Sequence, residues 1–256
     1  MLLEVKNLTM PCLEKLARKE IMALHVKEFI PPQVAAELTE KILKQGYNYY
    51  TNAPSIGRIG MAFYETEGNV SRLASYFDNA AYHRSDLRDR CAPLSSPIDL
   101  LRCTLDETWP AGAMLESLYG RKMYVGLSRV VDPDVTFLAH HDIFTKDAVD
   151  SFWAQSLLAQ LACNVYLSMP KTGGGLKIWD QEMEPAAFDA MRQSSYGIDP
   201  NALGEAHLHI EPEPGDLVLF NSHLMHAVMP GPEVPRLSLS CFVGYRGPAA
   251  PLTFWS

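Results

Sequence analysis

Short apolar segments separated by Gly, Pro and Asp fill the chain from Met123 onward. Segments of this length, bounded by turn residues, predict β-strands. We expect strands near residues 123–131, 135–142, 161–169, 175–180, 206–211, 216–220, 225–229 and 236–245, with helices near 147–160 and 185–192. This succession of strands, without β-α-β alternation or a Gly-rich phosphate loop, predicts a jelly-roll or barrel-like double sheet.

The first half of the chain has a different periodicity, in which apolar residues recur at helical spacing. The helices that this pattern predicts lie near residues 12–24, 33–44, 70–77, 97–107 and 111–119. We therefore expect a single α+β domain over residues 1–256. Its parts are mainly helical support (1–122), a jelly-roll core (123–245) and a C-terminal tail (246–256).

Composition is that of an ordinary globular protein, with 47% apolar and 20% charged residues. The net charge is −8, and the 22 Lys and Arg residues form no basic run, which disfavours nucleic acid and an anionic membrane as partners. The N-terminus MLLEVKNLTM lacks the apolar core of a signal peptide, and no stretch approaches the ~18 apolar residues of a membrane helix. The five cysteines are scattered and form no C-x-x-C pair. These features predict a cytoplasmic protein with reduced thiols.

Two histidines and an aspartate end one of the predicted strands, in the sequence TFLAHHDIF (136–144). Successive side chains of a strand point to opposite faces, so His140 and Asp142 share a face and His141 points away. An imidazole and a carboxylate two residues apart can both reach one metal ion. Taken alone, such a pair is more often a strand end with solvated polar residues, and a metal site needs a third ligand.

A third candidate ligand lies in the segment PGDLVLFNSHLMHAVMPGPEVPRLSLSCFVGY (214–245). His226 follows a predicted buried strand, and Arg236 and Ser238 share one face of the next strand, opposite an apolar face. Two imidazoles and one carboxylate form the facial set of non-haem Fe(II) oxygenases, which leaves three metal positions open. A guanidinium beside a hydroxyl can hold a carboxylate by a two-pronged, charge-assisted contact.

The ordered set His140-x-Asp142, His226 and Arg236-x-Ser238 resembles the motif of the Fe(II)/2-oxoglutarate-dependent oxygenase superfamily. The resemblance covers the β-rich half of the chain. It implies a double-stranded β-helix (jelly-roll, cupin-like) core with N-terminal helical support, and Fe(II), 2-oxoglutarate and O2 as cofactor and cosubstrates. It also implies that the two histidines and the aspartate hold the iron, while the arginine and serine hold the far carboxylate of 2-oxoglutarate.

The same resemblance decides between neighbouring histidines. His226 stands ten residues before Arg236, the spacing that the superfamily shows, whereas His223 stands thirteen residues before it. His226 is therefore the expected ligand. His141, on the opposite strand face from Asp142, is expected to be a packing residue or to support the metal ligands without binding the metal.

Further residues are candidates for the walls of the site. Asn164 and Tyr166 share the polar face of a predicted strand, and we expect them to hydrogen-bond 2-oxoglutarate. Trp179, on the next predicted strand, is a candidate for the substrate wall. The alternatives are a solvated strand face for the first two residues and simple core packing for the tryptophan.

Two segments are candidates for the substrate side of the cavity. The connection 147–160 is long for a barrel loop, and we expect a lid in which Phe152 and Trp153 contact substrate. Its apolar residues can equally just pack the segment down. Phe63 and Tyr64, with Arg58 and the cluster YNYY (47–50), are candidates to reach the cavity from the helical half.

The resemblance implies that 2-oxoglutarate is decarboxylated to succinate and CO2 while an unactivated C–H bond of the substrate is hydroxylated. Related halogenases carry a small residue where this chain has Asp142, so the carboxylate favours hydroxylation, with desaturation or cyclisation as further outcomes. The layout resembles free-standing enzymes that hydroxylate or halogenate amino acids, their derivatives or biosynthetic intermediates, so we expect a small-molecule substrate. The alternatives are a cupin-like metal enzyme that uses no 2-oxoglutarate, and a non-catalytic sensor that binds metal and 2-oxoglutarate.

Overall fold

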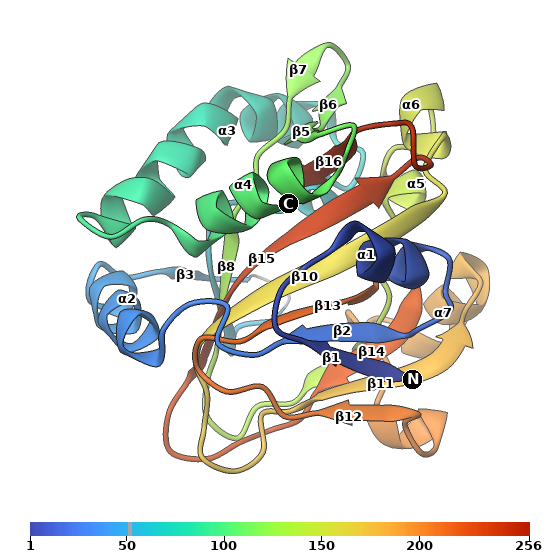
Figure 1. Cartoon of the computed structure of the whole chain (residues 1–256). Helices are drawn as coiled ribbons and strands as arrows, with labels where there is room; N and C mark the ends of the chain where they lie inside the picture. The colour runs from blue at the N-terminus through green and yellow to red at the C-terminus, as the bar shows by residue number, and fades with distance from the viewer. Residues whose placement is uncertain (51–52) are drawn as a thin grey trace.

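A computed structural model describes residues 1–50 and 53–256 and contains a large and a small β-sheet (Figure 1). The strands of the large sheet are β1 (Leu2–Val5), β2 (Ala23–Val26), β3 (Asn48–Tyr49), β4 (Ile56–Ile59), β5 (Ala113–Leu115), β8 (Leu127–Val131), β10 (Ala159–Ser168), β13 (Leu217–Asn221), β15 (Arg236–Tyr245) and β16 (Leu252–Trp255). The small sheet contains β9 (Phe137–His140), β11 (Leu176–Glu182), β12 (Leu208–Ile210) and β14 (Leu224–Val228). A hairpin of β6 (Ser117–Leu118) and β7 (Arg121–Lys122) forms a third, separate pair.

Strand order follows the double-stranded β-helix expected from the resemblance. The large sheet runs β1-β2-β13-β10-β15-β8-β4-β3, with β16 beside β15 and β5 beside β16. The small sheet runs β12-β11-β14-β9, and all of its pairs are antiparallel. The two longest strands, β10 and β15, lie side by side at the centre of the large sheet. The expected α+β fold class is confirmed.

Helices cover the outer face of the large sheet (Figure 1). The helices are α1 (Met10–Ala17), α2 (Pro32–Lys44), α3 (Val70–Cys91), α4 (Pro97–Thr108), α5 (Phe144–Asp147), α6 (Phe152–Gln155) and α7 (Pro185–Arg192), with 3-10 turns η1 (Phe63–Thr66) and η2 (Pro200–Leu203). Contacts of α1 and α2 with β10, and of α4 with β15, hold the first, second and fourth helices against this sheet. None of the helices in the described ranges is long and apolar enough to cross a membrane.

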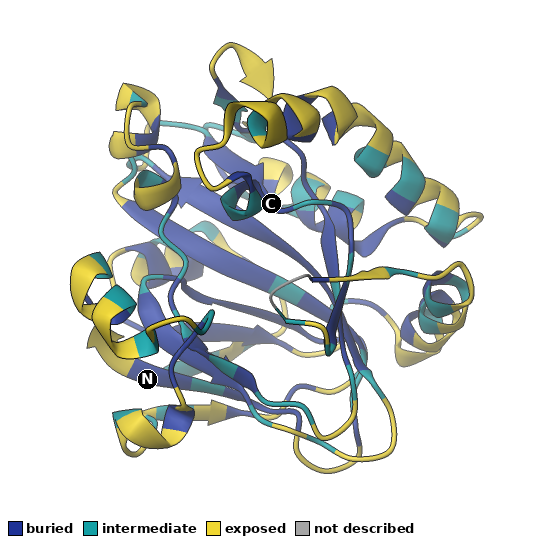
Figure 2. Ribbon diagram, turned by 180° about the vertical axis from the view of Figure 1, so that it is seen from behind, coloured by how far each residue is buried: buried dark blue, intermediate teal, exposed yellow. Residues whose placement is uncertain are grey.

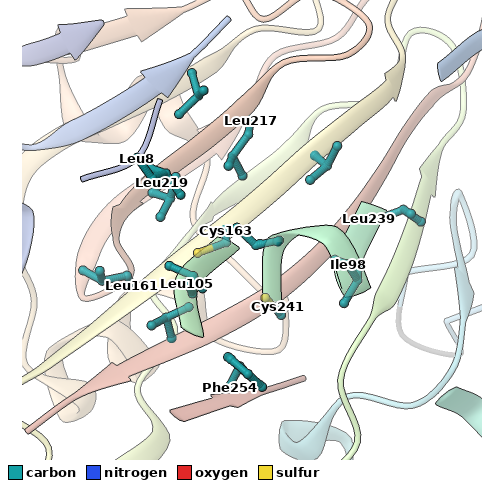
Figure 3. Packing of buried hydrophobic residues seen from close by; sticks show 14 of the residues in the cluster. Leu8, Ile98, Leu105, Leu161, Cys163, Leu217, Leu219, Leu239, Cys241 and Phe254 are labelled. Carbon is teal, nitrogen blue, oxygen red and sulfur yellow. The ribbon is translucent and has the colours of Figure 1, made fainter. Parts of the chain in front are cut away.

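Three apolar clusters follow from the alternation of side chains along the strands. One lies between the large sheet and its helices, where Leu217, Cys163 and Cys241 project from neighbouring strands (Figure 3). A second lies between the two sheets and includes Phe220 and Ile178, and a third lies behind the small sheet. Figure 2 shows the result, with buried strands between helices whose outer faces are exposed. The space between the sheets is where polar side chains gather.

The strands predicted from residue 123 onward are confirmed, as are the helices near 33–44, 97–107 and 185–192. The structure also corrects several expectations. Helix α1 ends at Ala17 because Lys19 adopts a left-handed backbone (φ 62°), and the next apolar residues form β2 instead of continuing the helix. That strand pairs with β1 on one side and β13 on the other, so long-range pairing outweighs the helical pattern.

Three further expectations also differ from the structure. The segment 111–119 forms β5 and β6 instead of a helix, because β5 pairs with β16. The segment 147–160 is not one helix: it holds the end of α5, the short helix α6 and the first residues of β10. The expected C-terminal tail contains β16, which extends the large sheet. Helix α3, in contrast, is longer than predicted and includes the polar stretch 83–90.

Candidate active site

Three potential metal ligands come together between the two sheets. His140 of β9 and His226 of β14 are cross-strand partners, and Asp142 follows two residues after the end of β9. One ligand atom from each of the three lies within 4.8 Å of the others. The Asp142 Oδ2 is 3.5 Å from Nε2 of His226 and 3.9 Å from Nε2 of His140. Phe220 of the large sheet packs against the His226 ring, with centroids 4.7 Å apart, so the set faces the interior of the barrel.

Both imidazoles are oriented in the same way by their own strands. Nδ1 of His140 lies 2.8 Å from the carbonyl oxygen of Leu138, and Nδ1 of His226 lies 2.9 Å from that of Leu224. A backbone carbonyl accepts a hydrogen bond from Nδ1–H, so the proton stays on Nδ1 and Nε2 keeps its lone pair. Both Nε2 atoms therefore point toward the Asp142 carboxylate, in the tautomer that a metal ion requires.

The protonation states also suit a cation. Burial, aided by the nearby His226, lowers the pKa of His140 to about 3, so its ring is neutral at pH 7. Burial alone would raise the pKa of Asp142, but the contact with His226 and the nearby His140 and Arg129 hold it well below its usual range. Neutral imidazoles and an ionised carboxylate are the forms that bind metal ions. The three residues thus fit one divalent cation.

A narrow cavity of about 40 Å³ leads from these residues along the inner face of the large sheet. Arg236 and Ser238 line it, together with Asn164 and Ser240. The Arg236 side chain is buried, its Nε has no hydrogen-bond partner, and it forms no ion pair with any residue of 1–50 or 53–256. A buried guanidinium without an anion is unfavourable, so this cavity fits a ligand with a carboxylate at that end.

Tyr166 supports the same end of the narrow cavity. Its ring lies under the Arg236 guanidinium, with 5.0 Å between the guanidinium carbon and the ring centroid. The Tyr166 hydroxyl is buried and has no partner among the described residues. This cation–π contact holds the guanidinium in place, and its N–H groups remain available to a ligand.

A second, wider cavity of about 490 Å³ opens on the other side of the three potential ligands. Four residues line both cavities: Arg129, Phe137, His140 and Asp142. Further lining residues come from the N-terminal half and from the segment after the metal motif, namely Tyr50, Ala53, Ile56, Tyr64, Glu67, Gly68, His141, Ile143, Lys146, Asp147, Val149, Phe188, Arg192 and Tyr196. The candidate ligands therefore stand where a narrow and a wide cavity meet.

The structure distributes the other predicted site residues unevenly. Asn164 lines the narrow cavity and Tyr166 lies behind it, beneath Arg236. Of the candidates from the N-terminal half, Tyr50 and Tyr64 line the wide cavity, whereas Arg58, Phe63 and residues 47–49 do not. His141, expected to be a packing residue, lies 4.4 Å from the ring of Phe188, between centroids.

Three aromatic residues do not contact either cavity. Trp179 points to the outer face of the small sheet, where its indole donates to the carbonyl of Gly204, because its neighbour Ile178 takes the inward position. Phe152 is 89% exposed, and Trp153 donates to the buried carboxylate of Glu116 and packs under Arg246. The expected lid contacts are thus absent in the described residues, and the connection is clamped to the C-terminal strands instead.

Several cavity residues were not predicted from the sequence. The most informative is Arg129 on β8, which lies opposite Ser238 of β15. Leu127, Arg129 and Val131 share one face of that strand, so a charged side chain stands between two apolar ones. Arg236 was singled out for a different reason, since Ser238 shares its face, whereas an arginine between two apolar side chains is the signal that would have identified Arg129. No comparable sequence pattern predicts that Lys146, Arg192 and Tyr196 line a cavity.

Comparison with known proteins agrees with this geometry. Residues 125–244, which include all three potential ligands, match the family model of the 2OG-Fe(II) oxygenase superfamily. Over 162 residues the chain is 33% identical to the L-gamma-glutamyl-L-propargylglycine hydroxylase of Streptantibioticus cattleyicolor, covering 62% of this chain and 59% of that protein. The chain therefore spans less than two thirds of the length of this relative.

Two further proteins are similar over more of their length. The chain is 26% identical over 219 residues to the leucinostatins biosynthesis cluster protein S of Purpureocillium lilacinum, covering 79% of this chain and 86% of that protein. The structure is similar to that of an N-substituted L-amino acid dioxygenase from Burkholderia ambifaria AMMD in complex with alpha-KG. The TM-score is 0.65 at 18% identity, and the match covers 96% of this chain and 90% of that chain, which confirms the fold.

Proposed function

The chain belongs to the 2OG-Fe(II) oxygenase superfamily, and from this premise we propose that it hydroxylates an unactivated C–H bond of a small amino-acid derivative. Enzymes of this superfamily use Fe(II), 2-oxoglutarate and O2. The observation that carries the proposal is the position of the His140, Asp142 and His226 set, where a narrow cavity ending in an unpaired buried guanidinium meets a wider one. Such a junction has room for a dicarboxylic cosubstrate on one side and a substrate on the other.

Each side chain then has a definite task. His140, Asp142 and His226 would hold Fe(II) through two Nε2 atoms and one carboxylate oxygen. Arg236 and Ser238 would hold the far carboxylate of 2-oxoglutarate, with Arg236 kept in place by the Tyr166 ring. Iron in this site, with its cosubstrates, supplies the oxidising power that converts R–H, O2 and 2-oxoglutarate to R–OH, succinate and CO2.

The walls of the two cavities have a separate task, which is to place the substrate and exclude water. Phe137 lines both cavities and packs against the His140 ring, with centroids 4.9 Å apart. It would separate the two ligands beside the metal. Asn164, whose side chain lines the narrow cavity, would donate to 2-oxoglutarate.

The substrate class rests on the relatives. One hydroxylates, by its name, a γ-glutamyl derivative of an amino acid, and a structural neighbour is named for N-substituted L-amino acids. A cavity of about 490 Å³ with apolar and charged walls suits a molecule of that size and mixed polarity. We therefore place amino acids with an acylated nitrogen first among candidate substrates.

Three broader features belong to the same proposal. The five unpaired cysteines favour a reducing compartment, so we propose a cytoplasmic location. Strands β1 to β4 of the N-terminal half continue the large sheet, which supports one domain over residues 1–256. The net charge of −8 disfavours nucleic acid as a substrate.

The test is an anaerobic titration of the metal-free protein with Fe(II) and then 2-oxoglutarate, followed through the visible charge-transfer absorption of the complex. Wild type is compared with His140→Ala, His226→Ala and Arg236→Gln. We expect the absorption band in wild type, its loss in both histidine variants, and a Kd for 2-oxoglutarate raised about ten- to hundredfold in Arg236→Gln.

A panel of N-acylated L-amino acids, including L-γ-glutamyl-L-propargylglycine, then tests turnover by succinate release and by a product mass increased by one oxygen. A wild type that binds Fe(II) but shows no band with 2-oxoglutarate would favour the cupin-like alternative. A band without turnover of any compound by an O2-exposed sample would favour a sensor.

A further inference from the structure

Three arginines line the two cavities, and they differ in how their charge is balanced. Arg192 is paired with Asp189 at 2.8 Å. Arg236 and Arg129 form no ion pair with any carboxylate in the described part of the chain. The 2-oxoglutarate carboxylate would balance Arg236. Arg129 is left without an anion.

The guanidinium of Arg129 is not fully exposed to solvent, so hydration alone does not balance its charge. Its Nη1 donates to the hydroxyl of Ser240 at 3.0 Å, while its Nε is buried without a hydrogen-bond partner in the part of the chain that the structure describes. The titratable groups that face it are the phenols of Tyr50 and Tyr64 and the Asp142 carboxylate. Burying a cation without an anion or a full set of hydrogen bonds costs several kcal/mol, by order of magnitude.

The carboxylates nearest to Arg129 are already committed. Asp142 belongs to the proposed metal site. Glu65 forms an ion pair with Arg58 at 2.9 Å and accepts a hydrogen bond from the backbone N–H of Ala62 at 2.7 Å. Within residues 1–50 and 53–256, these two carboxylates act near Arg129, and both are engaged elsewhere.

The position of Arg129 indicates which ligand can supply a carboxylate to its guanidinium. It lies opposite Ser238 on the neighbouring strand, yet it lines the wide cavity as well as the narrow one. Arg236, two residues from Ser238, takes the far end of the narrow cavity and lines only that cavity. Arg129 is thus the guanidinium that a ligand in the wide cavity meets beside the metal.

We infer that Arg129 binds a carboxylate of the substrate, so that the substrate is an anion such as an N-acylated amino acid with a free carboxyl group. This inference rests on the proposed function and narrows it. The hydroxyls of Tyr50 and Tyr64, on the same wall of the wide cavity, are placed to donate to the same carboxylate.

Other charged residues also line the wide cavity. Lys146 and Arg192 share one carboxylate, that of Asp189, at 3.3 and 2.8 Å, whereas Glu67 and Asp147 bring two acidic side chains to the same cavity. These charges largely offset one another, so Arg129 is the group that selects an anionic ligand.

The experiment measures binding of matched acids and amides to the anaerobic Fe(II)–2-oxoglutarate complex by isothermal titration calorimetry. The probes are N-acetyl-L-leucine with N-acetyl-L-leucinamide, and L-γ-glutamyl-L-leucine with its C-terminal amide. Wild type is compared with Arg129→Gln, Arg129→Lys and, as a matched control in the same cavity, Arg192→Gln. The Kd for 2-oxoglutarate is measured for each protein beforehand.

In wild type we expect at least one acid to bind about ten- to hundredfold more tightly than its amide, the range for a hydrogen bond to a charged group. Arg129→Gln brings this ratio to about one, Arg129→Lys keeps part of it, and Arg192→Gln changes it by less than about threefold, because that cation is already paired. The Kd for 2-oxoglutarate stays within about threefold in both Arg129 variants.

Two results would overturn the inference. One is a wild type that binds no acid in preference to its amide, and the other is an acid preference that survives in a folded Arg129→Gln variant. A rise in the 2-oxoglutarate Kd of Arg129→Gln as large as that of Arg236→Gln would assign Arg129 to the cosubstrate instead. Failure of the proposed function appears separately, as a wild type that does not bind 2-oxoglutarate at all.

Discussion

Two clusters in this protein combine histidine with aspartate, one around Asp142 and one around Asp216. Asp216 accepts hydrogen bonds from His25 Nε2 at 2.7 Å and from the backbone N–H groups of Glu28 and Glu213 at 2.9 and 3.0 Å. Among residues 1–50 and 53–256, the nitrogens within 4 Å of the Asp142 carboxylate that form ion pairs with it are two imidazole nitrogens, at 3.5 and 3.9 Å. The Asp216 carboxylate is thus satisfied by hydrogen bonds from the protein. The Asp142 carboxylate has no comparably close donor in the described residues.

The contrast separates a structural cluster from a ligand site. A buried carboxylate with close N–H donors is stable without further partners. A partly buried carboxylate whose nearest side-chain partners are imidazole nitrogens at 3.5 and 3.9 Å lacks close donors and gains most from a cation placed between the three groups. Residue type alone therefore does not identify a metal site; the direction of the donors does.

The largest expected effect that tests this contrast is a change in metal affinity. We expect Asp142→Asn to weaken Fe(II) binding at least about a hundredfold, since an amide oxygen carries no charge. The free energy of unfolding of the metal-free protein should fall by no more than about 1 kcal/mol, because the variant also removes a buried charge. Anaerobic Fe(II) titration and urea unfolding measure the two quantities. A large loss of stability with intact metal binding would make Asp142 a structural residue.

The pairing of His140 with Asp142 could be predicted from the sequence because it depends only on the local alternation of a strand. The central strands β10 and β15 were predictable for the same reason. Strand β2 was not, since its residues Ala23–Val26 continue a helical pattern and become a strand only by pairing with residues near 217–220. Pairings of that kind depend on chain segments nearly 200 residues apart, which no local pattern encodes.

Prediction of the site residues from the sequence meets the same limit. Arg129 lies opposite Ser238 only because β8 and β15 pair in one particular register. Trp179 occupies an inward or outward position according to a one-residue shift of its strand, and the aromatic side chain fits a core on either side. The sequence therefore indicates which residue types are present in a strand, but not which cavity each of them reaches.

The next largest effect concerns the other cluster. We expect Asp216→Asn to lower the free energy of unfolding by about 2–4 kcal/mol, because an amide that accepts from fewer donors leaves buried N–H groups unpaired. The Fe(II) affinity of the folded variant should stay within about threefold of wild type. Urea unfolding and anaerobic titration, run as for Asp142→Asn, give the comparison. Equal losses of metal affinity in both variants would remove the distinction between the clusters.

A somewhat smaller effect should appear as a pH dependence of stability. Burial alone would raise the pKa of Asp216, but the hydrogen bonds from His25, Glu213 and Glu28 lower it from 3.8 to about 2. A lowered folded-state pKa contributes stability above the unfolded value of 3.8, and this contribution is lost as the pH falls from there toward 2. Its size is about 2 kcal/mol. The difference in unfolding free energy between wild type and Asp216→Asn should therefore shrink between pH 5 and pH 2, and a difference that stays constant would contradict the assignment.

The smallest effect is expected at His141, the neighbour of His140. Both of its ring nitrogens are buried without a partner in residues 1–50 and 53–256, and burial lowers its pKa to about 4, so the ring is neutral and packs on Phe188. His141→Phe should leave Fe(II) and 2-oxoglutarate binding unchanged. It should raise the free energy of unfolding by up to about 1 kcal/mol, since it replaces unsatisfied polar atoms by an apolar ring of similar size. The same titrations and unfolding curves test this variant. A loss of Fe(II) affinity comparable to that of Asp142→Asn would mean that His141, and not His140, is the partner of Asp142, because the two residues differ only in the strand face from which they approach the carboxylate.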